Sequence, residues 1–291
     1  MSIKLDQVTY TYGIGSPFEK NALTETSVEI KEGEFVGIIG HTGSGKSTFV
    51  QLLNGLIQPT TGKVTVDGQD ISQKTKEAMT MRHKVGMVFQ YPEYQLFEET
   101  IAKDIAFGPR NFGLNEDEVT ARVKEAMDFV GLDYKTYADR SPFRLSGGQM
   151  RRVAIAGVIA IHPSYLILDE PSAGLDPVGR REIFTQIQRW HEEKGITVIL
   201  VSHNMDDISR LASRLLVLSH GHIVLDGKPL DIFAEKQKEL HDAGVSVPPV
   251  TAVLQYLQRR GFAVNDRVRT AEEGAKALYD CLQKGGHIHA H

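Results

Sequence analysis

The sequence has little that would hold it together covalently or carry it into a membrane. It contains one cysteine, Cys281, in 291 residues, so an internal disulfide framework is excluded and a reducing compartment is favoured. No apolar run approaches the roughly 20 residues that a membrane-spanning helix needs. The start, Met-Ser-Ile-Lys-Leu-Asp, has no apolar stretch of the kind found in secretory signals. We expect a cytoplasmic protein whose membrane role, if any, comes through a partner.

Excess positive charge is also missing. The formal net charge is -4, so no overall basic field favours nucleic acid as a partner. The one unusual tract is the end of the chain, where His287, His289 and His291 alternate with other residues. Metal binding there is conceivable, although a tail without a role is the more frequent reason for such a pattern.

Strand-like and helix-like segments alternate along most of the chain. Residues 3–12 and 26–30 alternate apolar and polar side chains, and 35–39 is a short apolar run typical of a buried parallel strand. Helical spacing follows at 49–56. Further strands are expected at 165–168, 196–201 and, as a hairpin, 214–226, with a helix at 178–194. This alternation predicts an α/β fold with a parallel sheet covered on both faces.

The alternation is interrupted once and then ends. Residues 92–163 read as helical, with Asn115 and Glu118 spaced as a helix start. From about Gly227 the character changes to a helix at 230–240, the break Pro248-Pro249, and a last helix at 271–282. We expect a main domain at 1–228 with a helical subdomain at about 92–163, and a small helical appendage at 229–291.

The strongest motif is a phosphate loop placed between the strand at 35–39 and the following helix. Its glycines allow backbone N–H groups to surround phosphates, and the helix N-terminus adds partial positive charge. Lys46 is expected to reach the β- and γ-phosphates of ATP, and the Ser47 hydroxyl to coordinate Mg²⁺. The predicted nucleotide-binding residues are Gly40, His41, Thr42, Gly43, Ser44, Gly45, Lys46, Ser47 and Thr48.

Two adjacent carboxylates end the strand at 165–168. Asp169 at the strand tip is placed to hold Mg²⁺, usually through water. Glu170 would polarise the attacking water as general base or as orienter. An Asp-Glu pair alone is an unremarkable strand end, but downstream of a phosphate loop it predicts nucleotide hydrolysis.

A second anion site is predicted at Leu145-Ser146-Gly147-Gly148-Gln149, before a helix. Ser146 is a typical N-cap residue, and Gly147, Gly148 and Gln149 present N–H groups at the helix start. One nucleotide does not need two such sites in one chain. Two copies facing head to tail do, each completing the nucleotide site of the other.

This pentapeptide resembles the signature of the ABC ATPase family. The resemblance implies a P-loop NTPase fold: a RecA-like core with a parallel sheet, an antiparallel β subdomain, an inserted helical subdomain, and here an α-rich C-terminal appendage. It also implies roles for residues that match the family's other motifs. These are Tyr12 on adenine, Gln90 near Mg²⁺ and the attacking water, Asp176 across the dimer, and His203 at the γ-phosphate. The predicted catalytic residues are thus Glu170, His203 and Gln90.

A narrower resemblance is carried by the segment 89–109, which contains Gln90-Tyr91-Pro92-Glu93, by His41-Thr42-Gly43 and by Ser141-Pro142-Phe143. This set is similar to the second of the paired ATPases in energy-coupling factor (ECF) transporters, which import vitamins and transition-metal ions. The resemblance implies a heterodimer with a related ATPase, favoured over a homodimer and aided by the C-terminal appendage. It also implies a membrane T subunit, substrate-binding S subunits and a peripheral place on the cytoplasmic face of the membrane. Glu93, Glu98 and Glu99 are candidate acidic contacts to the T subunit.

Two other interpretations share the ATP-binding motifs. The ATPase of another ABC importer would share everything except the 89–109 segment. A soluble ABC ATPase of DNA repair, chromosome organisation or translation would need long coiled-coil insertions or a second cassette, and neither is present.

Overall fold

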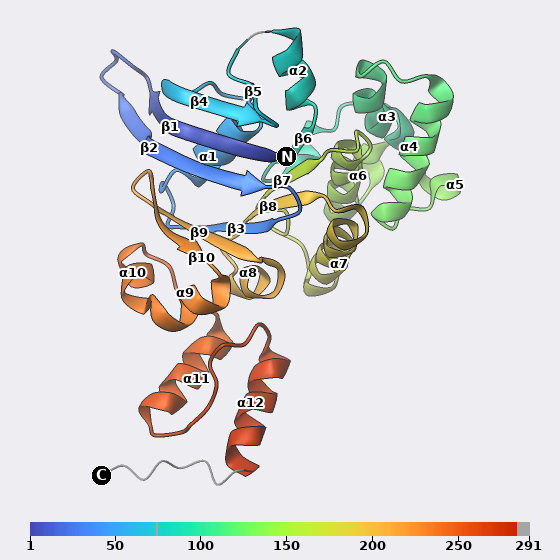
Figure 1. Cartoon of the computed structure of the whole chain (residues 1–291). Helices are drawn as coiled ribbons and strands as arrows, with labels where there is room; N and C mark the ends of the chain where they lie inside the picture. The colour runs from blue at the N-terminus through green and yellow to red at the C-terminus, as the bar shows by residue number, and fades with distance from the viewer. Residues whose placement is uncertain (74, 284–291) are drawn as a thin grey trace.

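The computed structural model describes residues 1–73 and 75–283, and the histidine tail considered as a metal site lies outside them. The described residues form two sheets, a block of helices beside them and a small helical unit at the end of the chain (Figure 1). None of the helices in this part of the chain is long and apolar enough to cross a membrane.

The larger sheet has the strand order β10-β9-β3-β8-β7-β6 and is parallel except for the β9–β10 hairpin. Every residue of β3, β7 and β8 is buried, as expected for strands covered on both faces. The predicted parallel sheet and hairpin are confirmed. The strands are β3 (Phe35–Ile39), β6 (Val85–Val88), β7 (Tyr165–Asp169), β8 (Thr197–Val201), β9 (Arg214–Ser219) and β10 (His222–Gly227).

The smaller sheet is antiparallel, in the order β2-β1-β4-β5. Its apolar face packs with α1 (Lys46–Leu53) and one face of the larger sheet in a shared core. Its strands are β1 (Ser2–Tyr12), β2 (Lys20–Lys31), β4 (Thr61–Val66) and β5 (Gln69–Asp70), and α2 (Lys76–Arg82) follows. The strands β1 and β2 were predicted from the sequence, whereas β4, β5 and α2 were not.

The helical insertion lies at the β6 edge of the larger sheet (Figure 1). The predicted helix start is confirmed, because Asn115 and Glu118 form a reciprocal capping box at α4. The insertion contains η1 (Pro92–Gln95), α3 (Ile101–Asn111), α4 (Glu116–Phe129), α5 (Tyr134–Tyr137), η2 (Pro142–Arg144) and α6 (Gly147–Ile159). Two further helices, α7 (Pro177–Lys194) and α8 (Met205–Leu211), belong to the parallel sheet's strand–helix alternation.

The C-terminal part differs from expectation in two respects. The single helix predicted at 230–240 is wrong: α9 (Pro229–Glu235) and α10 (Gln237–Asp242) are separated at Lys236, whose backbone leaves the helical region. Both short helices contribute to the main core, through Ile232, Phe233 and Leu240. The unit with a core of its own is therefore smaller than residues 229–291.

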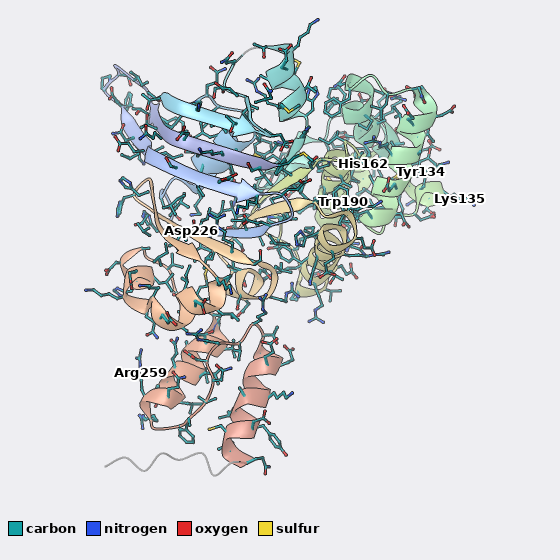
Figure 2. All side chains as sticks on the ribbon, viewed as in Figure 1. Tyr134, Lys135, His162, Trp190, Asp226 and Arg259 are labelled. Atoms are coloured by element: carbon teal, nitrogen blue, oxygen red, sulfur yellow. The ribbon has the colours of Figure 1, made fainter. Side chains whose placement is uncertain are left out.

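That small unit consists of α11 (Pro249–Arg259) and α12 (Ala271–Gln283). Leu254, Val264, Val268 and Cys281 form its core. Figure 2 shows it below the two sheets, with Arg259 on α11. It is attached to the main body by polar contacts, among them the hydrogen bond from the Gln255 side-chain amide to the carbonyl of Phe233, at 3.0 Å. A contribution of this unit to dimerisation stays a prediction.

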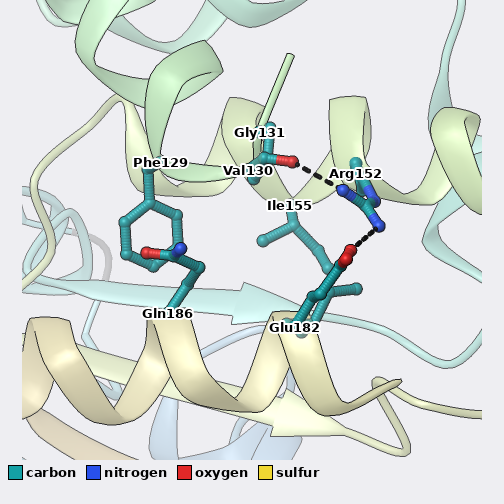
Figure 3. Close-up of a pocket in the computed structure, with 8 residues that line it drawn as sticks. Phe129, Val130, Gly131, Arg152, Ile155, Glu182 and Gln186 are labelled. Carbon is teal, nitrogen blue, oxygen red and sulfur yellow. Dashed lines mark hydrogen bonds and ion pairs between the residues drawn. The ribbon is translucent and has the colours of Figure 1, made fainter. Parts of the chain in front are cut away.

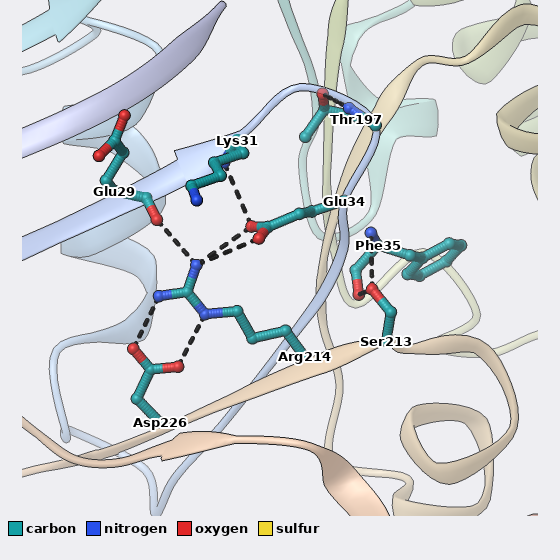
Figure 4. A network of polar contacts seen from close by, with 9 residues as sticks. Glu29, Lys31, Glu34, Phe35, Thr197, Ser213, Arg214 and Asp226 are labelled. Carbon is teal, nitrogen blue, oxygen red and sulfur yellow. Dashed lines mark hydrogen bonds and ion pairs between the residues drawn. The ribbon is translucent and has the colours of Figure 1, made fainter.

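Arg214 at the start of β9 ties the two sheets together (Figure 4). Its guanidinium donates two hydrogen bonds of 2.7 Å to the carboxylate of Asp226. It also donates to the Glu29 carbonyl of β2 at 2.8 Å and to the Glu34 carboxylate at 3.1 Å. Because one side chain contacts both sheets and the loop before β3, it fixes the frame from which the phosphate loop starts.

Candidate nucleotide-binding site

The phosphate loop leaves the buried strand β3 and ends at Lys46, where α1 begins. No side chain among the described residues caps this helix, so its first N–H groups remain available to a ligand. At two positions of the loop there is no room for a side chain, so only glycine fits. A Cβ on Gly40 would lie 2.2 Å from the Leu218 carbonyl oxygen, and one on Gly45 would lie 2.6 Å from that of Ala22. Gly45 also has a φ of 104°, which only glycine adopts readily.

Lys46 is buried, with 7% of its surface exposed. Its Nζ donates to the carbonyl oxygens of Gly40 at 2.8 Å and His41 at 3.0 Å. Burial lowers the pKa of Lys46, and the nearby carboxylates of Glu170 and Asp169 oppose that shift. The lysine is thus held inside the loop at the point where a phosphate charge would compensate its burial.

The two carboxylates at the end of β7 occupy different environments. Burial raises the pKa of Asp169, while a hydrogen bond with Ser47 and the charges of Lys46 and His203 lower it. Burial also raises the pKa of Glu170, to about 7, against a backbone hydrogen bond from His203. The φ of Glu170 is 51°, so the chain turns sharply there, and both carboxylates line the same pocket.

Most of the predicted site residues surround this pocket, which has a volume of about 390 Å³. The Tyr12 hydroxyl lies 3.0 Å from that of Thr48, which links the end of β1 to α1. Burial lowers the pKa of His203, which favours its neutral imidazole. The lining residues include Tyr12, Thr42, Gly43, Gly45, Lys46, Ser47, Thr48, Gln90, Asp169, Glu170 and His203.

Three phosphate-loop residues do not line the pocket. Gly40 stands behind the loop against Leu218, and Ser44 is fully buried with a hydroxyl that has no partner among the described residues. The His41 ring lies 4.9 Å from that of His220. In contrast, Lys20 at the start of β2 does line the pocket. No motif contained it, because only the pairing of β1 with β2 brings it beside Tyr12.

The signature lies in a different cavity, of about 500 Å³. Ser146, Gly148, Gln149 and Asp176 all line it, and none of them lines the first pocket. Ser146 caps α6 in a reciprocal capping box with Gln149, as its predicted N-cap role requires. Asp176 caps α7 by accepting a hydrogen bond from the Gly179 N–H at 2.6 Å. Within one chain, the two groups of motif residues therefore face separate hollows.

Arg152 anchors the signature helix to α7 (Figure 3). Its guanidinium donates to the Val130 carbonyl at 3.2 Å and to the Glu182 carboxylate at 2.5 Å. It lines both the signature cavity and a neighbouring hollow of about 330 Å³ between α4, α6 and α7. The position of the signature thus depends on contacts within the helical block.

One sequence-based expectation needs correction. Glu93 was a candidate acidic contact for a membrane subunit, but its carboxylate is 14% exposed and forms a two-bond ion pair with Arg151. Reversing its charge would break this internal pair, so the carboxylate is not available as a docking contact. Glu99 remains exposed and, within the described part of the chain, forms an ion pair with Lys103 alone, four residues further on.

The residues present suit magnesium. Oxygen donors are what Mg²⁺ prefers, and the Ser47 hydroxyl is hydrogen-bonded to the Asp169 carboxylate beside Gln90. Among residues 1–73 and 75–283 no group of three or more His, Cys, Asp or Glu side chains could hold a metal ion. A metal at this site would therefore depend on a few protein oxygens plus water and phosphate, as magnesium commonly does in nucleotide sites.

The family follows from comparison with known proteins. A family model described as ABC transporter matches residues 23–173, so the chain belongs to the ABC transporter ATPases. The energy-coupling factor transporter ATP-binding protein EcfA2 of Clostridium perfringens is 53% identical over 283 residues, covering 97% of this chain and 99% of that protein. A protein of the same name from Streptococcus pyogenes serotype M3 is 50% identical over 280 residues, covering 96% and 99%. Within the ABC family, the chain belongs to these ECF transporter ATP-binding proteins of the A2 type.

Solved structures agree with the predicted fold class. CbiO1 from Clostridium perfringens, part of the ABC transporter complex CbiONQ, aligns with a TM-score of 0.72 and 35% identity, covering 89% of this chain and 96% of that one. The ATP-binding cassette MJ0796, as a dimer in a post-hydrolysis state bound to ADP and Pi, aligns with a TM-score of 0.70 and 32% identity, covering 78% and 98%. The P-loop NTPase fold is confirmed.

Proposed function

We propose that the chain is the ATP-hydrolysing motor subunit of an ECF-type ABC importer for vitamins or transition-metal ions. It acts at the cytoplasmic face of the membrane, to which its partners attach it. Its curated relatives carry the name of ECF ATP-binding proteins, and CbiO1 is named as part of a transporter complex. The substrate is chosen by separate membrane subunits, so this chain supplies only the energy.

The observation that carries this proposal is the separation of the two half-sites. The phosphate loop, Glu170 and His203 line one pocket, while Ser146 and Asp176 line another. A chain that used both sets on its own nucleotide would bring them together. Two ATPase chains arranged head to tail do so across their interface, each offering its signature to the nucleotide of the other.

The energetics suit a dimer that closes on ATP. Ser146 and the N–H groups at the start of α6 would donate to the γ-phosphate held by the opposite chain. Each such charge-assisted hydrogen bond contributes roughly 1.5–3 kcal/mol. Two or three at each of two sites exceed the roughly 5.5 kcal/mol that moves a two-state equilibrium from 1:99 to 99:1. Loss of the γ-phosphate then allows reopening.

The residues of the first pocket divide the chemical work. Lys46 and the loop N–H groups bind the phosphates, and Tyr12 packs against the adenine. Ser47, Asp169 and Gln90 would hold Mg²⁺, which neutralises phosphate charge when bound. Glu170 accepts a proton from the attacking water or orients it, and a pKa raised to about 7 by burial suits that exchange at neutral pH. His203 contacts the γ-phosphate as a neutral imidazole.

The partners are a second, related ATPase and a membrane T subunit with its S subunits. We favour the heterodimer because the segment 89–109, His41-Thr42-Gly43 and Ser141-Pro142-Phe143 resemble the second of the paired ECF ATPases. The segment after Gln90 offers a docking surface: Tyr94, Phe97 and Phe107 expose 84%, 56% and 46% of their surfaces. Phe97 and Phe107 also pack against each other, and exposed aromatic side chains are typical of interaction sites.

Ser146→Arg tests the arrangement, with Ser27→Arg on the exposed face of β2 as control. We expect the Ser146 variant to bind ATP with unchanged affinity and to fail in ATP-dependent association with its partner ATPase, measured by size-exclusion chromatography. Normal association would contradict the assignment of the signature to the opposite chain.

Purification of the tagged chain from detergent-solubilised membranes, followed by mass spectrometry, tests the partners. A second ATPase with a small membrane subunit is expected, and a large two-domain permease would indicate another importer class.

A further inference from the structure

Arg151, in the second turn of α6, joins the signature helix to the segment that follows Gln90. Its side chain is only 3% exposed. Its Nε donates to Oε2 of Glu93 at 3.1 Å, and its Nη2 donates to Oε1 at 2.8 Å. Two parallel bonds between a guanidinium and a carboxylate fix orientation as well as distance. Glu93 in η1 therefore cannot shift without α6.

The same guanidinium contacts the residue directly after Gln90. Its central carbon lies 5.7 Å from the centre of the Tyr91 ring, within the range of a cation–π interaction. The φ of Tyr91 is 56°, a conformation that non-glycine residues keep only when their surroundings hold it. Through its contacts with Tyr91 and Glu93, Arg151 thus holds the backbone that follows Gln90.

The third nitrogen of Arg151 has a different environment. Nη1 is buried and has no hydrogen-bond partner in the part of the chain described. An unpartnered buried donor is costly and calls for an explanation. The position of a Cβ on Gly174 would lie 3.9 Å from Nη1, so this nitrogen faces the backbone of the loop 172–176. That loop ends in Asp176, which the proposed function assigns to the dimer interface.

We propose that Arg151 is a positioning residue that couples the Gln90 segment to the loop 172–176, its Nη1 donating to a backbone carbonyl of that loop in the closed, ATP-bound dimer. The inference rests on the proposed function. Movement of Gln90 with the nucleotide passes through Glu93 and Arg151 to both the signature and the loop. The signature and the loop 172–176, which both face the opposite chain in the proposed dimer, then move together. Arg151 acts through these elements and does not touch ATP.

The test uses Arg151→Lys in the full chain assembled with its partner ATPase. Lysine keeps the positive charge but cannot supply three directed donors at once. Arg110→Lys is the matched control, because Arg110 makes a similar two-bond pair with Glu116, both bonds 2.8 Å, on the exposed surface of the same helical block. We measure ATP affinity, KM and kcat, together with amide hydrogen exchange of a peptide covering 172–176 in the ATP-bound state.

For Arg151→Lys we expect unchanged ATP affinity and KM, a fall of about tenfold in kcat, and faster exchange over 172–176. Arg110→Lys should leave all of these unchanged. If Arg151→Lys keeps kcat within twofold of the wild type, or changes kcat without changing exchange at 172–176, the inference is wrong. Wild-type chain that hydrolyses no ATP would instead refute the proposed function.

Glu93→Gln, which leaves Nη1 in place, should lower kcat less than Arg151→Lys does. An equal or larger loss would assign the effect to the ion pair alone.

Discussion

Nε2 of His203 lies 3.8 Å from Oε1 of Glu170, too far for a hydrogen bond, and that carboxylate oxygen is buried with no hydrogen-bond partner among residues 1–73 and 75–283. Burial disfavours the charged carboxylate and raises the pKa of Glu170 to about 7, against a backbone hydrogen bond from His203. In the proposed function, this oxygen would accept a proton from the attacking water or orient it. This arrangement gives Glu170 its proposed role.

Glu170→Gln should bind ATP normally and lose at least about a hundredfold in turnover, because the amide cannot accept a proton. The variant should accumulate as an ATP-bound dimer. Steady-state hydrolysis and size-exclusion chromatography check both outcomes. Glu29→Gln, on the exposed side of β2, is the control. Near-normal hydrolysis by the Glu170 variant would remove this residue from its role.

The pKa of Glu170 also predicts how stability depends on pH. The folded pKa of about 7 lies above the ordinary value of 4.5, so the folded state binds more protons between these two pH values. Stability should therefore fall as pH rises from about 4.5 to 7, by about 3 kcal/mol from this group. Glu170→Gln should be the more stable protein at pH 8. Urea unfolding of the nucleotide-free proteins at pH 5 and pH 8 measures the difference, and equal pH dependence would argue against a buried acid.

Gly45→Ala should destabilise the fold by at least about 2 kcal/mol and abolish ATP binding. Its Cβ would collide with the Ala22 carbonyl at 2.6 Å, in addition to the strain of a φ of 104°. Gly33→Ala separates these causes, because Gly33 has a φ of 76° with open space around it. We expect about 1 kcal/mol there. Thermal unfolding and nucleotide titration make the comparison.

Arg214→Ala should cost about 2 kcal/mol of stability, because it leaves the Asp226 and Glu34 carboxylates without their shared partner. Arg189→Ala is the matched control. Arg189 pairs with Glu193 on an exposed helix face, where such pairs contribute at most a few tenths of a kcal/mol. Equal losses in urea unfolding would mean that the link between the sheets contributes little.

Phe97→Ser should reduce recovery of the membrane subunit without changing ATP affinity. Phe97 packs edge to face on Phe107, at 4.9 Å between ring centres, and both are exposed. Phe18→Ser is the control, since Phe18 is 86% exposed on the connection between β1 and β2. Co-purification from membranes is the measurement, and equal recovery with both variants would place the docking surface elsewhere.

The sequence by itself determined the phosphate loop and the buried strands of the parallel sheet. Glycine spacing around Lys46 and the apolar strand before it predicted the phosphate loop, because a phosphate cradle needs glycine backbone next to a helix start. The short apolar runs before Gly40 and Asp169 predicted the parallel sheet, because strands covered on both faces are apolar throughout. These features are local: neighbours in the chain suffice to specify them.

Tertiary structure alone decided which residues share a hollow. The motifs do not reveal that Lys20 lines the pocket beside Tyr12, nor that His41 and Ser44 do not line it. Glu93 looked like a surface acid until the fold buried Arg151 against it. Ion pairs and cavities join residues that are distant in the chain, so hydrophobic period and motif spacing carry no information about them. Only the packing of α6 against the Gln90 segment specifies that contact.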